Sequence, residues 1–107
     1  KFPEIITPSS KNGSEHIYQM YTIRLSNKDV RDKLHDFLTK KSIFSKVYFN
    51  PIHLTDFYRN KFGMKENSLP VTELISQQIL TIPLYPNMNL EEKKYLTDSI
   101  SEFFDSK

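Results

Sequence analysis

The feature that most constrains this chain is residues 46–58, where a short apolar run leads directly into a turn fixed by Pro51. Residues 45–49 contain the aromatic and β-branched side chains that are typical of a strand. Because proline has no N–H to donate to a sheet, Pro51 is expected to end this strand and begin the turn. The turn presents His53 beside several aromatic rings. If the chain contains a site, we expect it here.

Apolar periodicity divides the rest of the chain into short strands and amphipathic helices. Tyr21, Ile23 and Leu25 alternate with polar residues and predict a strand within residues 16–25. A brief strand is also expected within 80–86, where two prolines limit its length. Helices are expected after residue 27, from 55 to 61, from 68 and from 89.

Several of these helices carry recognisable end signals. Ser26 or Asn27 offers an N-cap to the first helix, since a short polar side chain can accept a hydrogen bond from a free backbone N–H. Asn89 is followed three residues later by Glu92, which is the pattern of a capping box at the last helix. Gly63 is expected to end the short helix in a left-handed conformation.

Each helix also carries apolar residues that the pattern predicts to be buried. Ser68 is the cap candidate of the third helix. In chain order, the residues expected to point toward the core are Val30, Leu34, Phe37, Leu38, Phe57, Tyr58, Phe62, Val71, Leu74, Ile75, Ile79, Leu96, Ile100, Phe103 and Phe104.

This order of elements predicts an α+β fold, in which a small, mostly antiparallel sheet is covered by helices. The length of 107 residues suits a single domain. Residues 1–15 contain two prolines, a glycine and a polar run, and are expected to form an extended lead-in or linker before the domain at 16–107. The opening of the chain suggests a piece of a larger protein.

Composition excludes several classes of function. The chain has no cysteine, which removes disulfides, thiolate metal sites and a cysteine nucleophile, and fits a cytoplasmic protein. No apolar run is long enough to span a bilayer, so no membrane partner is expected. The net charge of +2 gives no electrostatic argument for nucleic acid. Aromatic rings interleaved with lysines keep nucleic-acid binding as a minor alternative, which predicts salt-dependent retention of oligonucleotides.

The histidines are the main candidates for site chemistry. His53 could offer a proton donor or acceptor to a ligand, or it could hydrogen-bond the local backbone and stabilise the turn. His16, at the head of a strand, and His35, near the wet face of a helix, are weaker candidates. No two histidines have metal-ligand spacing, and no glycine-rich loop or nucleophile elbow occurs, so we expect no metal site and no catalytic residue.

Four segments, which with the closing helix cover most of the chain, form a recognisable series: HIYQMYTIR at 16–24, KVYFNPIHL at 46–54, LPVTE at 69–73 and ILTIPLYP at 79–86. In this order they resemble the small C-terminal domain of the DegT/DnrJ/StrS aminotransferases, which use pyridoxal phosphate to aminate keto sugars attached to nucleotides. Two departures are SIFS at 42–45, where many members have glycine-isoleucine-glycine-threonine, and Val47, where many have histidine.

The resemblance implies a three- or four-stranded sheet with helices on one side. It also implies that a large domain, absent from this sequence, supplies the Schiff-base lysine, an aspartate partner for the cofactor and the phosphate-binding residues. We therefore expect no cofactor to bind to this chain alone, and a homodimer for the full-length enzyme. His53 and Tyr48 match family positions near the substrate pocket and are the candidate substrate-binding residues.

The resulting hypothesis is a fragment of an enzyme that moves an amino group, from glutamate, to a nucleotide-linked keto sugar. The isolated fragment is expected to be inactive. The alternative is a free-standing α+β module for interaction or small-ligand binding. A domain that packs on a larger one should expose an apolar patch around the Pro51 turn or the lead-in segment.

Overall fold

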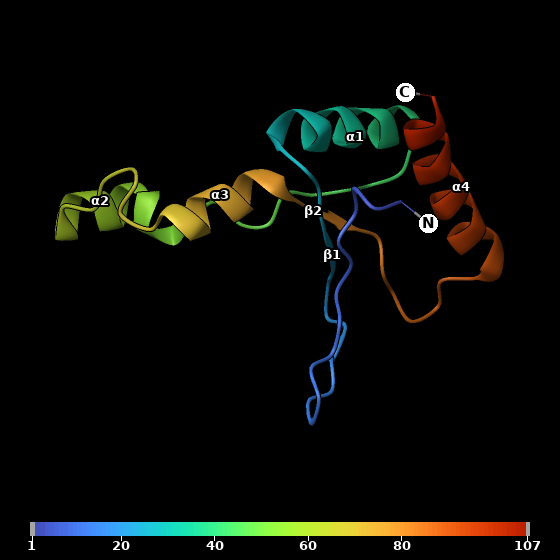
Figure 1. Cartoon of the computed structure of the whole chain (residues 1–107), viewed down its shortest axis with the longest axis horizontal. Helices are drawn as coiled ribbons and strands as arrows, with labels where there is room; N and C mark the ends of the chain where they lie inside the picture. Colours follow the sequence, from blue (N-terminus) through green and yellow to red (C-terminus); the bar gives the residue numbers. More distant parts are fainter. Residues whose placement is uncertain (1, 107) are drawn as a thin grey trace.

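The computed structural model describes residues 2–106 and has an α+β architecture (Figure 1). Its elements, in chain order, are β1 (Tyr21–Arg24), α1 (Lys28–Lys40), the short 3-10 helix η1 (Ile52–Leu54), α2 (Asp56–Phe62), α3 (Pro70–Gln78), β2 (Ile79–Ile82) and α4 (Leu90–Asp105). This sequence of elements confirms the predicted fold class and the predicted order of helices.

The sheet is smaller than expected, because it contains only the two antiparallel strands β1 and β2 within the described residues. Tyr21 pairs with Ile82, and Arg24 pairs with Ile79. The strand expected at 45–49 is reduced to a single bridge between Lys46 and Thr81, with N···O distances of 2.9 and 2.8 Å. Pro83 directly follows β2, and Pro51 lies a few residues after Lys46, so neither segment can extend its pairing far beyond these residues.

The lead-in segment adds one more bridge to the other side of β1. Ile6 exchanges two backbone hydrogen bonds with Arg24, both at 2.9 Å. Phe2 stacks on Phe104 of α4, with ring centroids 5.3 Å apart. Residues near the beginning of the described chain therefore pack against β1 and α4.

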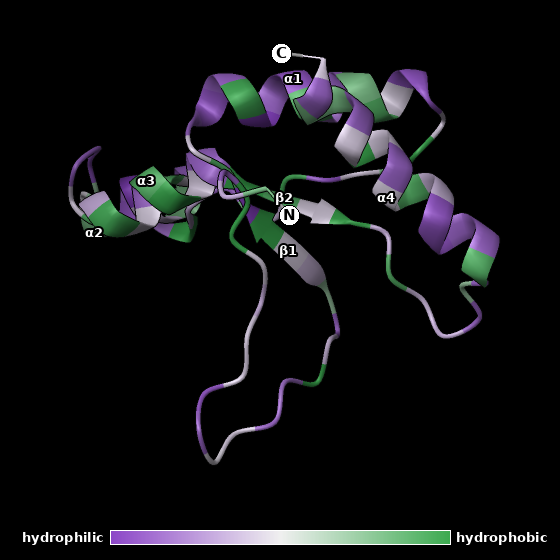
Figure 2. Cartoon of the chain, turned by 45° about the vertical axis from the view of Figure 1, so that its right-hand side comes forward, coloured by the Kyte–Doolittle hydropathy of each residue, from purple (hydrophilic) through white to green (hydrophobic). Residues whose placement is uncertain are grey.

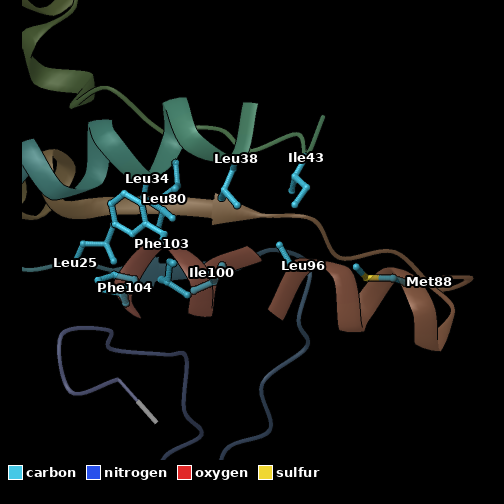
Figure 3. Close-up of a cluster of buried hydrophobic side chains, with 11 residues drawn as sticks. Leu25, Leu34, Leu38, Ile43, Leu80, Met88, Leu96, Ile100, Phe103 and Phe104 are labelled. Carbon is cyan, nitrogen blue, oxygen red and sulfur yellow. The ribbon is translucent and has the colours of Figure 1, made fainter. Parts of the chain in front are cut away.

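The hydrophobic core lies where α1 and α4 meet the sheet (Figure 3). Leu34 and Leu38 of α1 and Leu80 of β2 are completely buried. Side chains from α4 close the cluster from the other side. The full set of buried apolar residues is Ile23, Leu25, Leu34, Leu38, Ile43, Leu80, Met88, Leu96, Ile100, Phe103 and Phe104.

Both predicted N-caps of the long helices are confirmed. The Asn27 side chain accepts a hydrogen bond from the backbone N–H of Val30 at 2.9 Å. Asn89 and Glu92 form both hydrogen bonds of the capping box, each at 2.9 Å. These contacts satisfy N–H groups that have no partner in the first helical turn, and they fix where α1 and α4 begin.

The helices α2 and α3 form an arm that extends away from the sheet on the side opposite α4 (Figure 1). The prediction that Phe57, Tyr58 and Phe62 point into the core is wrong, since they are 59%, 38% and 59% exposed. Val71 and Leu74 on α3 are also exposed. The periodicity correctly marks an apolar face, but this face has no covering element among residues 2–106. The apolar colour on α2 and α3 is visible in Figure 2.

Two further details of the arm concern its helix ends. Gly63 ends α2 with φ of 65°, as predicted for a left-handed cap. Ser68 is not the cap of α3, because Leu69 occupies the N-cap position and the Ser68 hydroxyl donates to the Lys65 carbonyl.

No helix among the described residues has the length and apolar character needed to cross a bilayer.

Candidate functional site

The Pro51 turn is held by hydrogen bonds within a few residues. The Leu54 N–H donates to the Pro51 carbonyl at 3.0 Å, and the Thr55 N–H donates to the Ile52 carbonyl at 3.1 Å. The Thr55 hydroxyl donates to the same Ile52 oxygen at 2.7 Å. The backbone around His53 is therefore fixed by its own turn and by the helix α2 that follows it.

The imidazole of His53 is 6% exposed and points toward α3. Its Nε2 lies 2.9 Å from Oε1 of Glu73, a residue twenty positions further along the chain. The alternative in which His53 bonds to the backbone of its own turn is not what the structure shows. The ring instead connects the turn to the first turn of α3.

The carboxylate of Glu73 accepts two hydrogen bonds from backbone N–H groups in addition to its contact with His53. The backbone N–H of Asn67 donates to Oε2 at 2.9 Å, and that of Leu69 donates to Oε1 at 3.2 Å. These bonds lower the pKa of Glu73, with the Asn67 amide as the largest cause and His53 next. Glu73 is not among the site residues that the sequence predicts. The available signal was its position in the first helical turn after Pro70, where carboxylates commonly hold free N–H groups.

A hollow of about 650 Å³ lies beside this pair, between the Pro51 turn and the arm. Its walls are mostly aromatic and aliphatic, and the imidazole of His53 and the phenol of Tyr58 are the ionisable groups among the residues that line it. The lining residues are Phe49, Asn50, Pro51, Ile52, His53, Tyr58, Phe62, Met64, Leu69 and Thr72. An apolar cleft with a few polar groups is the usual form of a small-molecule site. The expected apolar patch around Pro51 is thus present.

Tyr48, the other candidate, does not line this hollow. It borders a separate space of about 150 Å³ together with Lys46 and Thr81. The ammonium group of Lys46 lies 4.8 Å from the centre of the Tyr48 ring, a cation–π contact. The structure therefore places His53 and Tyr48 in neighbouring hollows, and Phe49, which follows Tyr48 in the chain, shares the hollow with His53.

The remaining histidines lie elsewhere. Nδ1 of His35 is 2.7 Å from the hydroxyl of Ser45, and Nδ1 of His16 accepts from the N–H of Tyr18 at 2.9 Å. Within residues 2–106 there is no group of three or more potential metal ligands. Both rings have local structural partners, and neither approaches the hollow of His53.

The hollow does not by itself fit pyridoxal phosphate. Such a site needs a lysine for the Schiff base, a carboxylate for the pyridine nitrogen and backbone N–H groups around the phosphate. The residues that line the hollow include neither a lysine nor a carboxylate. The lining residues suit one wall of a site for a neutral, partly apolar group.

Comparison with known proteins places this geometry in context. Residues 1–101 match the model of the DegT/DnrJ/EryC1/StrS aminotransferase family. The chain belongs to this family. The structure and the match together identify the Pro51 turn and the arm as parts of an aminotransferase fold.

The relatives that this chain matches are much longer than it is. It is 33% identical over 101 residues to the "Pleiotropic regulatory protein" of Geobacillus stearothermophilus, covering 94% of this chain and 26% of that protein. It is 35% identical over 81 residues to the UDP-4-amino-4-deoxy-L-arabinose–oxoglutarate aminotransferase of Shewanella sediminis, covering 72% of this chain and 21% of that one. The chain thus spans about a quarter of the length of the relatives it matches.

The fold also matches solved aminotransferase structures. DesV of S. venezuelae, solved in complex with a ketimine intermediate, superposes with a TM-score of 0.83 and 24% identity. The superposition covers 94% of this chain and 26% of DesV. At this identity the match supports the fold alone.

Proposed function

We propose that this chain is the C-terminal small domain of a pyridoxal-phosphate-dependent sugar aminotransferase. The observation that carries the proposal is the family match over residues 1–101 by a chain that spans about a quarter of its relatives. On this proposal, residues 1–15 lead in from a large domain of the same polypeptide, and residues 16–107 form the small domain.

The reaction proposed for the full-length enzyme is an amino transfer. Glutamate gives up its amino group and becomes 2-oxoglutarate, while the carbonyl of a nucleotide-linked keto sugar becomes a primary amine. The relative from Shewanella sediminis, whose name includes a UDP-linked amino sugar and oxoglutarate, supports both the sugar and the donor. Residues of the large domain would hold pyridoxal phosphate, which would supply the chemistry of amino transfer.

This chain would contribute a wall of the sugar pocket. The hollow beside His53 offers aromatic and aliphatic surface with one imidazole, which suits a sugar ring with both C–H faces and hydroxyl groups. Tyr48, which lines the adjoining hollow, would contact another part of the same substrate. The lysine, the aspartate and the phosphate cradle would come from the large domain, and we propose that the full-length enzyme is a homodimer.

The exposed apolar arm supports a covered position in the full-length protein. Phe57 and Val71, on the arm helices α2 and α3, are 59% and 68% exposed. A patch of this kind is unusual on a free monomer. Burial of the arm against the large domain or a second subunit would complete the hollow.

The test is to express the full-length protein and to measure bound pyridoxal phosphate and 2-oxoglutarate formation from glutamate. The reaction should require a nucleotide-linked keto sugar, and the amino sugar should appear in equal amount. A full-length protein that binds the cofactor but aminates only amino-acid-derived keto acids would contradict the sugar assignment. A protein that binds no cofactor would contradict the proposal as a whole.

A further inference from the structure

The His53–Glu73 contact fixes which nitrogen of the imidazole carries a proton. An ionised carboxylate can only accept hydrogen bonds, so His53 Nε2, 2.9 Å from Glu73 Oε1, must donate. In the neutral ring the other nitrogen, Nδ1, then has a free lone pair. We propose that Glu73 is a positioning residue, which holds His53 so that Nδ1 accepts a hydrogen bond from a sugar hydroxyl or amino group in the hollow.

The accessibility of His53 Nδ1 follows from the burial and the hydrogen bonds of the ring. Among residues 2–106, every completely enclosed side-chain nitrogen or oxygen has a hydrogen-bond partner. The one hydrogen bond of the His53 ring is made by Nε2. Nδ1 therefore keeps some access to solvent although the residue is 6% exposed, and the space that His53 borders is the aromatic hollow.

Glu73 is well placed for this task because it cannot easily rotate away. Both of its oxygens are engaged by backbone N–H groups, from Asn67 and Leu69, and its side chain is 14% exposed. These same donors keep the carboxylate ionised, which preserves its role as an acceptor. The proton on Nε2 is thus determined by the fold of the arm before any ligand arrives.

The arrangement also selects the chemistry of the ligand. An acceptor nitrogen in an apolar hollow favours a group with a proton to donate, and it disfavours a phosphate oxygen, which has none at neutral pH. This inference rests on the proposed function, and it assigns His53 to the sugar part of a nucleotide sugar instead of its diphosphate.

The direct test is ¹⁵N NMR of the imidazole in this chain at about pH 8, with two-bond ¹H–¹⁵N correlations to assign the tautomer. The proton should reside on Nε2, and Nδ1 should be unprotonated. In Glu73→Gln, exchange of the Nε2 proton with water should rise at least about tenfold, because an acceptor of full charge is lost. Glu66→Gln, which makes the same change on the exposed face of the arm, should match the wild type.

A proton on Nδ1, protonation of both nitrogens, or unchanged exchange in Glu73→Gln would overturn the proposal. Should Glu73→Gln fail to fold, the tautomer of the unsubstituted chain still decides the question. No enzyme activity is needed for this measurement, so its outcome is independent of the proposed function.

A kinetic test in the full-length enzyme addresses the ligand, with a UDP-linked keto sugar as the probe. Glu73→Gln should raise the KM for this sugar at least about tenfold and leave the KM for glutamate unchanged. His53→Asn keeps an oxygen acceptor at the δ position and should retain more activity than His53→Gln. If the wild type turns over but these variants do not differ, the positioning role fails. If the wild type does not aminate the sugar, the proposed function fails.

Discussion

Arg31 of α1 donates a hydrogen bond from Nη1 to the backbone carbonyl of Ser76 near the end of α3, at 3.2 Å. The same nitrogen lies 3.3 Å from the carbonyl of Ile79, where β2 begins. The Arg31 side chain is almost fully buried, and its Nε is paired with Asp32 at 2.6 Å. This contact joins the core to the base of the arm that carries Glu73, so it helps to set the position of the candidate site.

Replacing Arg31 should therefore destabilise the chain. In Arg31→Met, two carbonyls at the junction of α3 and β2 lose their donor, and we expect the free energy of unfolding to fall by about 2–3 kcal/mol. Urea denaturation followed by circular dichroism measures this change. Arg59→Met is the matched control, because its ion pair with Glu66 is exposed and should contribute at most about 1 kcal/mol. Equal losses in the two variants would contradict this role for Arg31.

Two leucines should distinguish the core from the arm. Leu80 of β2 is completely buried, whereas Leu74 of α3 is 52% exposed. Leu80→Ala should lower the free energy of unfolding by about 2–5 kcal/mol, because it leaves a cavity among packed side chains. Leu74→Ala should change it by less than about 1 kcal/mol. The same denaturation assay applies, and a larger effect for Leu74 would show that the arm is packed more tightly than the structure indicates.

The capping box of α4 gives a third prediction. Asn89→Ala removes the acceptor of the Glu92 N–H and should cost about 0.5–2 kcal/mol of stability. Asn87, two positions earlier and outside any helix, is a control of identical chemistry, and Asn87→Ala should have little effect. Thermal unfolding of both variants measures the difference. A similar melting temperature for the two would argue against the box as a stabilising feature.

Local signals in the sequence predicted the helices well. The caps at Asn27 and Asn89 and the left-handed Gly63 depend on contacts between residues a few positions apart. The core stripes of α1 and α4 were also correct, because both helices pack within this chain. Strand lengths were overestimated, since a strand requires a distant partner and here only residues 21–24 and 79–82 find one over more than a single pair.

The arm and the site were harder to predict for the same reason. The apolar faces that carry Phe57 and Leu74 follow the pattern of buried helices, but no described element covers them. An apolar pattern predicts that a helix face is buried, but it does not identify the element that covers that face. His53 was found through its turn and its family resemblance, whereas its contact with Glu73 joins two turns and has no local signature.

The lowered pKa of Glu73 leads to a prediction about acid stability. Its ordinary value is 4.5, and the folded state holds it lower, so its contribution to stability is fully present above that pH and is lost as the pH falls through the folded-state pKa. The stability difference between the wild type and Glu73→Gln should therefore shrink from about pH 6 to about pH 3. Urea denaturation at each pH measures it. A constant difference would contradict the ionised hydrogen-bonded state of Glu73.

Steady-state kinetics of the full-length enzyme with a nucleotide-linked keto sugar tests most directly whether the hollow beside His53 forms a wall of the sugar pocket. His53→Leu should lower kcat/KM for the sugar by about 10- to 100-fold, which corresponds to the loss of one hydrogen bond in a dry site. His16→Leu, in a loop away from the hollow, should retain wild-type kinetics. If His53→Leu turns over the sugar as well as His16→Leu does, the hollow is not part of the sugar pocket.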